Sequence, residues 1–242
     1  IGMGSIKKNL TRLIDKKKIS EDRAGEILSK ITKVTEYEAA HKCGLVVEAI
    51  NEEIEAKKDL FTKLDNICKP ETILASNTSS LSITEIASIS KRSDKVIGMH
   101  FFNPAPVMRL VEIIRGVNTS DETVNTVKEI VDSIGKESIE VSEGPGFVVN
   151  RILIPMINEA IGVLGDGLAS KEDIDKAMTL GANHPIGPLA LADLIGNDIC
   201  LSILEVLLKE TGDPKYRPHS LLRKMVRAGY FGRKCGKGFY EY

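Results

Sequence analysis

Tryptophan is absent from the 242 residues of this chain, and only four cysteines are present. They are Cys43, Cys68, Cys200 and Cys235, and no two of them form a C-x-x-C pair. Widely separated cysteines without such spacing are typical of reduced thiols, and they do not match the ligand spacing of a metal site. The sequence therefore predicts no disulfide framework, and we expect no metal centre.

An excess of one charge and a long apolar run are also missing. The 33 basic and 34 acidic residues leave a formal net charge of -1, so no basic surface is predicted for nucleic acid or anionic lipid. No apolar run is long enough to cross a bilayer. The first residues match neither a secretory signal nor a transit peptide. We therefore expect a cytoplasmic protein that binds neither nucleic acid nor membranes.

What is present is an alternation of short apolar runs with helical patterns. Strands are predicted at 31–35, 45–50, 73–75, 96–99, 109–114 and 138–141. Such alternation is typical of an α/β fold with a mostly parallel sheet.

After the punctuation Glu143-Gly144-Pro145-Gly146 the pattern is helical throughout, with a single helix predicted from Pro188 to about Thr211. The change in pattern predicts one domain at 1–143 and an all-helical domain at 144–242.

Polar side chains follow two of the predicted strands. Ser79 belongs to a run of small polar residues after 73–75, and a lone His100 follows 96–99. Because ligands bind outside the carboxyl ends of parallel strands, we expect Ser79 and His100 on one rim. The next strand carries a single acid, Glu112, whose burial is costly unless it is paired. The sequence therefore predicts a hydrogen bond between His100 and Glu112.

A structural interpretation competes at each of these positions. A histidine among apolar residues is often a core residue, and a serine-rich turn is often only a helix N-cap, which Ser82 would supply here. The combination of hydroxyl, imidazole and carboxylate on three consecutive elements favours proton transfer. At the start, Gly2-Met3-Gly4 lacks both the third glycine and the preceding strand of a dinucleotide-binding loop.

Six segments carry a resemblance to a known family: LVVEAINEE, ASNTSSLSI, GMHFFNPAPVMRLVEII, GPGFVVNRIL, EDIDKAMTLGANHPIGP and GKGFYEY. They resemble the 3-hydroxyacyl-CoA dehydrogenases, and most closely the bacterial short-chain 3-hydroxybutyryl-CoA dehydrogenases, over nearly the whole chain. The resemblance implies a Rossmann-like dinucleotide-binding domain that is incomplete here, because the family's glycine-rich loop would precede the first residues.

For function, the resemblance implies reversible hydride transfer between a short 3-hydroxyacyl-CoA and NAD or NADP, in fatty-acid and butanoate metabolism. His100 would be the general acid and base, Glu112 would orient it, and Ser79 and Asn150 would bind the substrate oxygens. The positions implied to bind the cofactor are Glu52, Lys57, Asn77 and Asn103.

Two of these positions have simpler interpretations. Asn150 could be bonded only to backbone, and Lys57 could form an ordinary i,i+4 salt bridge with Glu53. For the whole chain, one alternative is a non-catalytic fragment that acts as a dimeric acyl-CoA-binding or structural module. Another is a hydride-transferring enzyme for small hydroxy acids, which would have lysine where this chain has His100.

The first helix after Gly146 is apolar around much of its circumference, which predicts a homodimer, with burial inside one subunit as the alternative. The apolar residues are Phe147, Val148, Val149, Ile152, Leu153, Ile154, Met156 and Ile157.

Overall fold

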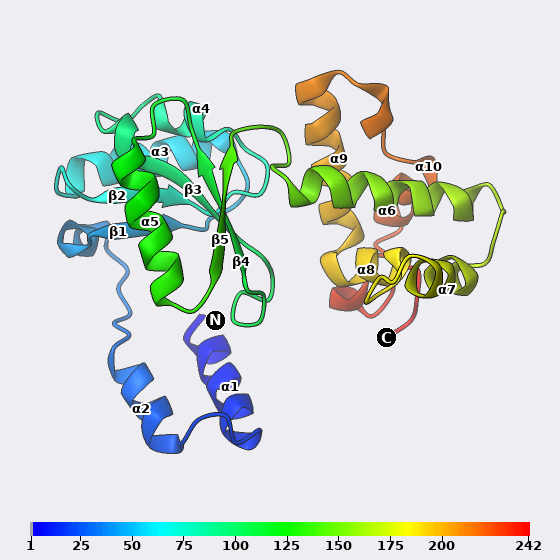
Figure 1. Ribbon diagram of the computed structural model, residues 1–242, viewed down its shortest axis with the longest axis horizontal. Helices are drawn as coiled ribbons and strands as arrows, with labels where there is room; N and C mark the ends of the chain where they lie inside the picture. The colour runs from blue at the N-terminus through cyan, green and yellow to red at the C-terminus, as the bar shows by residue number, and fades with distance from the viewer. Residues whose placement is uncertain (1) are drawn as a thin grey trace.

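The computed structural model describes residues 2–242 and consists of two lobes, a sheet lobe (residues 2–142) and a helical lobe (residues 149–242), joined by the linker 143–148 (Figure 1). The strands of the sheet lobe are β1 (Leu45–Glu48), β2 (Ile73–Ser76), β3 (Val96–Phe101), β4 (Leu110–Arg115) and β5 (Glu137–Ser142).

The five strands form one sheet in the order β1-β2-β3-β4-β5, and the predicted α/β class is confirmed. Strands β1, β2 and β3 are parallel, β4 runs antiparallel to β3, and β5 is parallel to β4. The reversal at β4 was not predicted. Its cause is the short connection 102–109, since a parallel crossover needs about a dozen residues or more.

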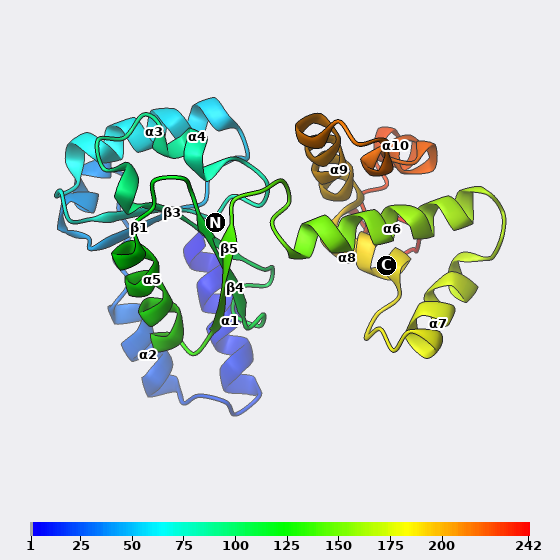
Figure 2. The same ribbon diagram turned by 45° about the horizontal axis from the view of Figure 1, so that its top comes forward.

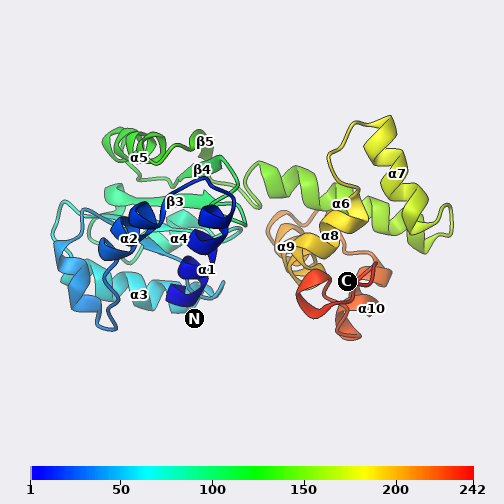
Figure 3. The same cartoon turned by 90° about the horizontal axis from the view of Figure 1, so that it is seen from below.

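Helices cover both faces of the sheet, so this lobe has three layers (Figure 3). Helices α3 (Ile54–Ile67) and α4 (Ile83–Ala87) pack on one face through Phe61 and Ile86. Helix α5 (Asp121–Ser133) packs on the other face, where its buried valines follow helical spacing. Ser82 caps α4, as predicted, by accepting a hydrogen bond from the amide of Glu85.

Two helices precede the sheet, α1 (Gly2–Asp15) and α2 (Glu21–Ser29), and they lie side by side beneath it (Figures 1 and 2). Gly2 and Gly4 are both inside α1, so these glycines form no phosphate-binding loop. The prediction of a strand at 31–35 is wrong. This segment is largely exposed and has no neighbouring strand to pair with, and a strand needs such a partner to be stable.

The helical lobe contains α6 (Val149–Gly165), α7 (Lys171–Gly181), α8 (Pro188–Ile195), α9 (Asn197–Thr211) and α10 (Ser220–Arg227). The prediction of a single helix from Pro188 to Thr211 is wrong, because the chain turns at Gly196 with φ of 112°. No α-helix continues through that backbone conformation, and glycine adopts it without steric cost. α6, α8 and α9 share the core of this lobe.

No helix in residues 2–242 is long and apolar enough to span a membrane. All four cysteines are free thiols, Cys68 and Cys200 buried and Cys43 and Cys235 exposed. Burial raises the pKa of Cys200 to about 12, which keeps that thiol protonated and unreactive.

The end of the chain is held by a buried carboxylate on α8. Asp193 is 1% exposed and accepts hydrogen bonds from the amides of Phe239 and Tyr240, each at 2.9 Å. A β-carbon added to Gly238 would lie 1.9 Å from Oδ1 of Asp193. The glycine therefore lets the last residues approach the carboxylate closely enough for both hydrogen bonds.

Substituting Gly238→Ala is expected to lower the free energy of unfolding by about 2–3 kcal/mol, because the new methyl group must displace a fully buried carboxylate. Urea denaturation measures this loss. Gly25→Ala is the matched control, since no atom lies within 4 Å of its added β-carbon and alanine favours the surrounding helix. Equal denaturation midpoints for Gly238→Ala and the wild type would contradict the prediction.

Candidate active site

The centre of the site is a histidine and a glutamate on adjacent strands. The antiparallel register of β3 and β4 places His100 directly opposite Glu112. Nδ1 of His100 donates a hydrogen bond to Oε2 of Glu112 over 2.7 Å, which confirms the predicted pair. Glu112 is wholly buried and His100 is 6% exposed. Because Nδ1 is engaged, Nε2 is the ring nitrogen available to exchange a proton with a ligand.

The second oxygen of Glu112 reaches the other lobe, which the sequence did not indicate. Oε1 accepts hydrogen bonds from the amides of Val148 at 3.1 Å and Val149 at 3.0 Å, where α6 begins. No side chain of α6 itself caps this end. A carboxylate is favourable at a helix N-terminus because it meets unpaired N–H groups and the positive end of the helix dipole. Glu112 thus binds His100 and α6 together.

Two aromatic rings enclose the imidazole. The centroid of Phe102 lies 4.5 Å from that of His100, and the centroid of Phe147 lies 5.6 Å away. Phe147 has φ of 51°, a left-handed conformation uncommon for a side chain of this size, and it follows Gly146 with φ of 71°. This turn brings the Phe147 ring against His100 and directs the next amides toward Glu112.

Ser79 and Asn150 come together from opposite lobes. Nδ2 of Asn150 donates to the carbonyl oxygen of Ser79 at 3.4 Å, and Asn150 is 9% exposed. The bond is to backbone, as the simpler interpretation of Asn150 proposed, but the acceptor belongs to the sheet lobe and not to the asparagine's own helix. This hydrogen bond therefore connects the two lobes.

Glu52 is bonded to the loop that carries Ser79. Its Oε1 accepts from Oγ1 of Thr78 at 2.6 Å and from the amide of Ser79 at 2.8 Å. Burial favours a higher pKa for Glu52, but hydrogen bonds from Thr78 and Ser79 and the charge of Lys57 outweigh it. The pKa of Glu52 is held below its ordinary value, so this carboxylate is ionised at neutral pH.

Lys57 lies inside the protein, where it is 1% exposed. Its Nζ is 2.7 Å from Oε1 of Glu48 and 3.3 Å from Oε2 of Glu52. It therefore pairs with these two residues and not with Glu53, so the alternative of an i,i+4 salt bridge to Glu53 is wrong. The role of Glu48 was missed, although an acid within an apolar strand was the signal for a buried pair.

Asn77 also forms a hydrogen bond within the sheet lobe, whereas Asn103 is exposed. Oδ1 of Asn77 accepts from the amide of Phe101 at 2.9 Å, which ties the end of β2 to β3. Asn103 is the second residue of the loop after β3, and its peptide bond to Pro104 is cis. Nζ of Lys136 holds this loop from the α5–β5 turn by donating to two of its backbone carbonyls.

The two exposed residues of this set, Asn103 and Glu52, have side chains that can bind a dinucleotide. Asn103 is exposed and the Glu52 side chain is 37% exposed, and both follow strands of the parallel part of the sheet. A carboxylate and an amide there can bond ribose hydroxyls and a carboxamide. Lys57 is buried in its ion pairs with Glu48 and Glu52, and Oδ1 of Asn77 is bonded to the amide of Phe101.

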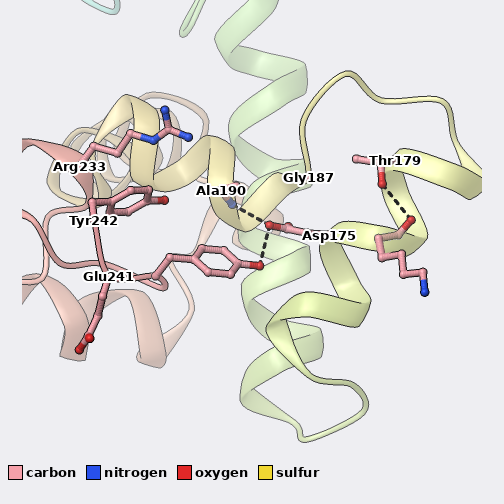
Figure 4. A pocket seen from close by; sticks show the side chains of 9 residues that line it. Asp175, Thr179, Gly187, Ala190, Arg233, Glu241 and Tyr242 are labelled. Carbon is pink, nitrogen blue, oxygen red and sulfur yellow. Dashed lines mark hydrogen bonds between the residues drawn. The ribbon is translucent and has the colours of Figure 1, made fainter.

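A hollow on the surface lies next to the run of small polar residues that contains Ser79. This hollow of about 340 Å³ lies between the lobes and is lined by Ser80, Glu143 and Lys209 among others. A second, of about 430 Å³, lies on the helical lobe beside Asp175 and Tyr242 (Figure 4). None of the predicted site residues lines either hollow, although Ser80 of the first hollow directly follows Ser79.

Asp175 has a structural role beside that second hollow. Its carboxylate accepts from the amides of Leu189 and Ala190 at the start of α8 and from the hydroxyl of Tyr240 at 2.9 Å. These bonds link α7, α8 and the end of the chain.

Two family models cover this chain. The NAD binding domain of 3-hydroxyacyl-CoA dehydrogenase matches residues 1–144, and the C-terminal domain of 3-hydroxyacyl-CoA dehydrogenase matches residues 146–242. Known proteins agree with them. A 3-hydroxybutyryl-CoA dehydrogenase of Clostridioides difficile is 60% identical over 235 residues, 97% of this chain and 84% of that protein. The human mitochondrial hydroxyacyl-coenzyme A dehydrogenase is 43% identical over 239 residues, which are 96% of this chain and 76% of that protein.

Among solved structures, the (S)-3-hydroxybutyryl-CoA dehydrogenase of Ralstonia eutropha superposes with a TM-score of 0.95 at 52% identity, covering 100% of this chain and 85% of that one. The fold and the matched NAD-binding domain define an NAD-dependent oxidoreductase. The chain belongs to the 3-hydroxyacyl-CoA dehydrogenase family.

Proposed function

We propose that this protein interconverts 3-hydroxybutyryl-CoA and acetoacetyl-CoA by reversible hydride transfer with NAD. The observation that carries the proposal is the buried pair of His100 and Glu112, whose carboxylate also binds the first turn of α6. That arrangement provides a proton-exchanging imidazole with a fixed ring. Relatives named for this substrate support the choice of acyl group.

His100 is the general base in the direction of oxidation. Its Nε2 takes the proton of the 3-hydroxyl group, while Glu112 holds Nδ1–H and stabilises the imidazolium that forms. In the reverse direction the same nitrogen returns the proton to the carbonyl oxygen. NAD, when bound, supplies the acceptor for the hydride that leaves C3.

Ser79 and Asn150 bind and orient the substrate oxygens, one from each lobe. Bringing them together requires the lobe arrangement that Glu112 stabilises. For the cofactor, Glu52 and Asn103 supply the direct contacts. Lys57 acts through Glu52, and Asn77 acts by tying β2 to β3.

The two lobes divide this work. The domain at 1–143 holds the cofactor and the proton-exchanging pair, and the domain at 144–242 supplies Asn150 and closes the site. A homodimer formed through the helical lobe belongs to the same proposal. Ile154 and Ile157 of α6 are buried within the subunit, so part of the apolar circumference needs no partner, but Ile152 is 69% exposed. A cytoplasmic location remains a prediction.

Acetoacetyl-CoA reduction tests the function. With the full-length protein, NADH oxidation is expected on acetoacetyl-CoA, with lower kcat/KM on longer 3-ketoacyl-CoAs. NADPH in place of NADH measures cofactor preference. Free 3-hydroxybutyrate is expected to be a much poorer substrate for oxidation than its CoA ester, because binding energy from the CoA part is lost. Turnover of the free acid at a comparable rate would instead support a small hydroxy-acid dehydrogenase.

The dimer is tested by placing a charge on its proposed contact. Ile152→Lys is expected to convert the dimer to monomer in sedimentation velocity, because a lysine there would lose its hydration in the interface. Val117→Lys is the control, since Val117 is 80% exposed and lies in the sheet lobe. A wild-type protein that sediments as a monomer at micromolar concentration would contradict the proposal.

A further inference from the structure

We infer that Glu48 and Lys57 are positioning residues, which act with Glu52 to hold the serine loop (residues 76–80) in place for substrate binding. The inference rests on the proposed function of Ser79. It assigns a purpose to a buried ion pair that the hydride-transfer chemistry does not otherwise use.

The ion pair of Glu48 and Lys57 is the buried part of this set of contacts, and it joins the end of β1 to α3. The Glu48 side chain is wholly buried and contacts Nζ of Lys57 at 2.7 Å. It also accepts from Oγ of Ser76 at 2.6 Å and from the amide of Ile50 at 2.6 Å. Burying two charges without such partners would cost several kcal/mol, so a wholly buried pair requires this full set of bonds. Glu48 thereby anchors the first residue of the serine loop.

Glu52 is the partly exposed part of the same set of contacts. Its Oε2 lies 3.3 Å from Nζ of Lys57. Four donors from the serine loop converge on its Oε1. The shorter contacts come from Oγ1 of Thr78 at 2.6 Å and the amide of Ser79 at 2.8 Å. The longer ones come from the hydroxyls of Ser79 at 3.2 Å and Ser80 at 3.3 Å.

One carboxylate oxygen cannot accept four strong hydrogen bonds, since an ionised carboxylate has only about four lone-pair positions on two oxygens. The two shorter bonds fix the loop backbone at Thr78 and Ser79. The Ser79 hydroxyl is then a weakly held donor, which can turn to a substrate oxygen while the residue itself stays in place. Glu52 thus fixes where Ser79 is without consuming its hydroxyl.

Lys57 couples the two parts because one ammonium lies between two carboxylates. Without that charge, Glu52 would lose its ionic partner and turn toward water, and the serine loop would lose its strongest acceptor. Ser79 would then be misplaced relative to Asn150, whose Nδ2 bonds its carbonyl oxygen. Small errors in the placement of a binding group are costly for rate.

Hydrogen exchange of the cofactor-free protein tests this positioning without reference to activity. Glu52→Gln, which alters a partly exposed side chain, is expected to raise exchange at the amides of residues 78–81 at least roughly tenfold, as expected for a local opening. Glu53→Gln is the matched control, since Glu53 is an exposed neighbour whose side chain forms no hydrogen bond or ion pair with the loop in the described residues. Lys57→Met should reproduce the change, and Lys57→Arg should restore much of the protection. Unchanged exchange in Glu52→Gln would overturn the inference.

A double-mutant cycle then tests whether Glu52 acts through Ser79. At saturating NADH, where weaker cofactor binding no longer limits the rate, Glu52→Gln is expected to lower kcat/KM for acetoacetyl-CoA roughly 10- to 10²-fold in the wild type, but to have little effect in a Ser79→Ala background. Multiplicative losses at saturating NADH would mean that Glu52 does not act through Ser79, and would overturn the inference. If the wild type reduces no acyl-CoA, the proposed function fails, whereas the hydrogen-exchange result still decides whether the serine loop is held as described.

Discussion

The variant His100→Gln is expected to have a kcat roughly 10²- to 10⁴-fold below that of the wild type, the usual range for losing a general acid and base. Glutamine fills similar space and can keep a hydrogen bond to Glu112, but it cannot accept and return a proton. The KM for acetoacetyl-CoA should change far less, because His100 is assigned to proton exchange and Ser79 and Asn150 to binding.

Steady-state kinetics in both directions measure the effect of His100→Gln. The control is His184→Gln, which alters a histidine in the loop after α7. The unfolding transition of both variants should match that of the wild type within a few degrees, so that lost turnover is not lost structure. Near-normal turnover in His100→Gln would show that another group exchanges the proton.

Glu112→Gln is expected to reduce both kcat and stability. Each oxygen of Glu112 accepts a hydrogen bond, one from His100 and the other from the first amides of α6. Glutamine has one acceptor oxygen, and its NH₂ group must face a donor on the other side. The substitution leaves a buried donor unsatisfied, which costs about 1–3 kcal/mol of stability. It also removes the charge that stabilises imidazolium, so we expect kcat to fall roughly 10²-fold.

Thermal unfolding and kcat together test this dual role. Glu137→Gln is the control, because Glu137 pairs with Arg109 at the exposed edge of the sheet and both side chains are largely exposed. A loss of kcat with unchanged stability would mean that the contact of Glu112 with α6 contributes nothing. A loss of stability with unchanged kcat would mean that Glu112 only joins the lobes.

The results for the His100 and Glu112 variants test whether the contact between the lobes and the proposed proton transfer depend on the same residue. The residue that orients the imidazole also binds the helix from which Asn150 projects. A shift of α6 relative to the sheet would therefore disturb the pairing of His100 and the placement of Asn150 together. The proposed proton-exchanging pair and the proposed substrate contact are therefore linked through Glu112, and they are built from both lobes.

The sequence by itself determined which residues meet at the centre of the site. A lone acid within an apolar strand must find a partner, and the lone imidazole at the end of the preceding strand is the group available to pair with it. That requirement holds whichever way the strand runs. The pair was therefore predicted, although the antiparallel direction of β4 was not. The helical lobe was likewise evident from periodicity, because helix patterns depend on local spacing.

Only the tertiary structure decided what the remaining polar atoms do. Lys57 pairs with Glu48 and Glu52, residues of the preceding strand and turn, and the helical spacing of its neighbours suggested Glu53 instead. Likewise, no local pattern shows that Glu112 binds amides 36 and 37 residues further along the chain. Periodicity records which face of an element is buried, whereas hydrogen-bond partners depend on how separate elements pack.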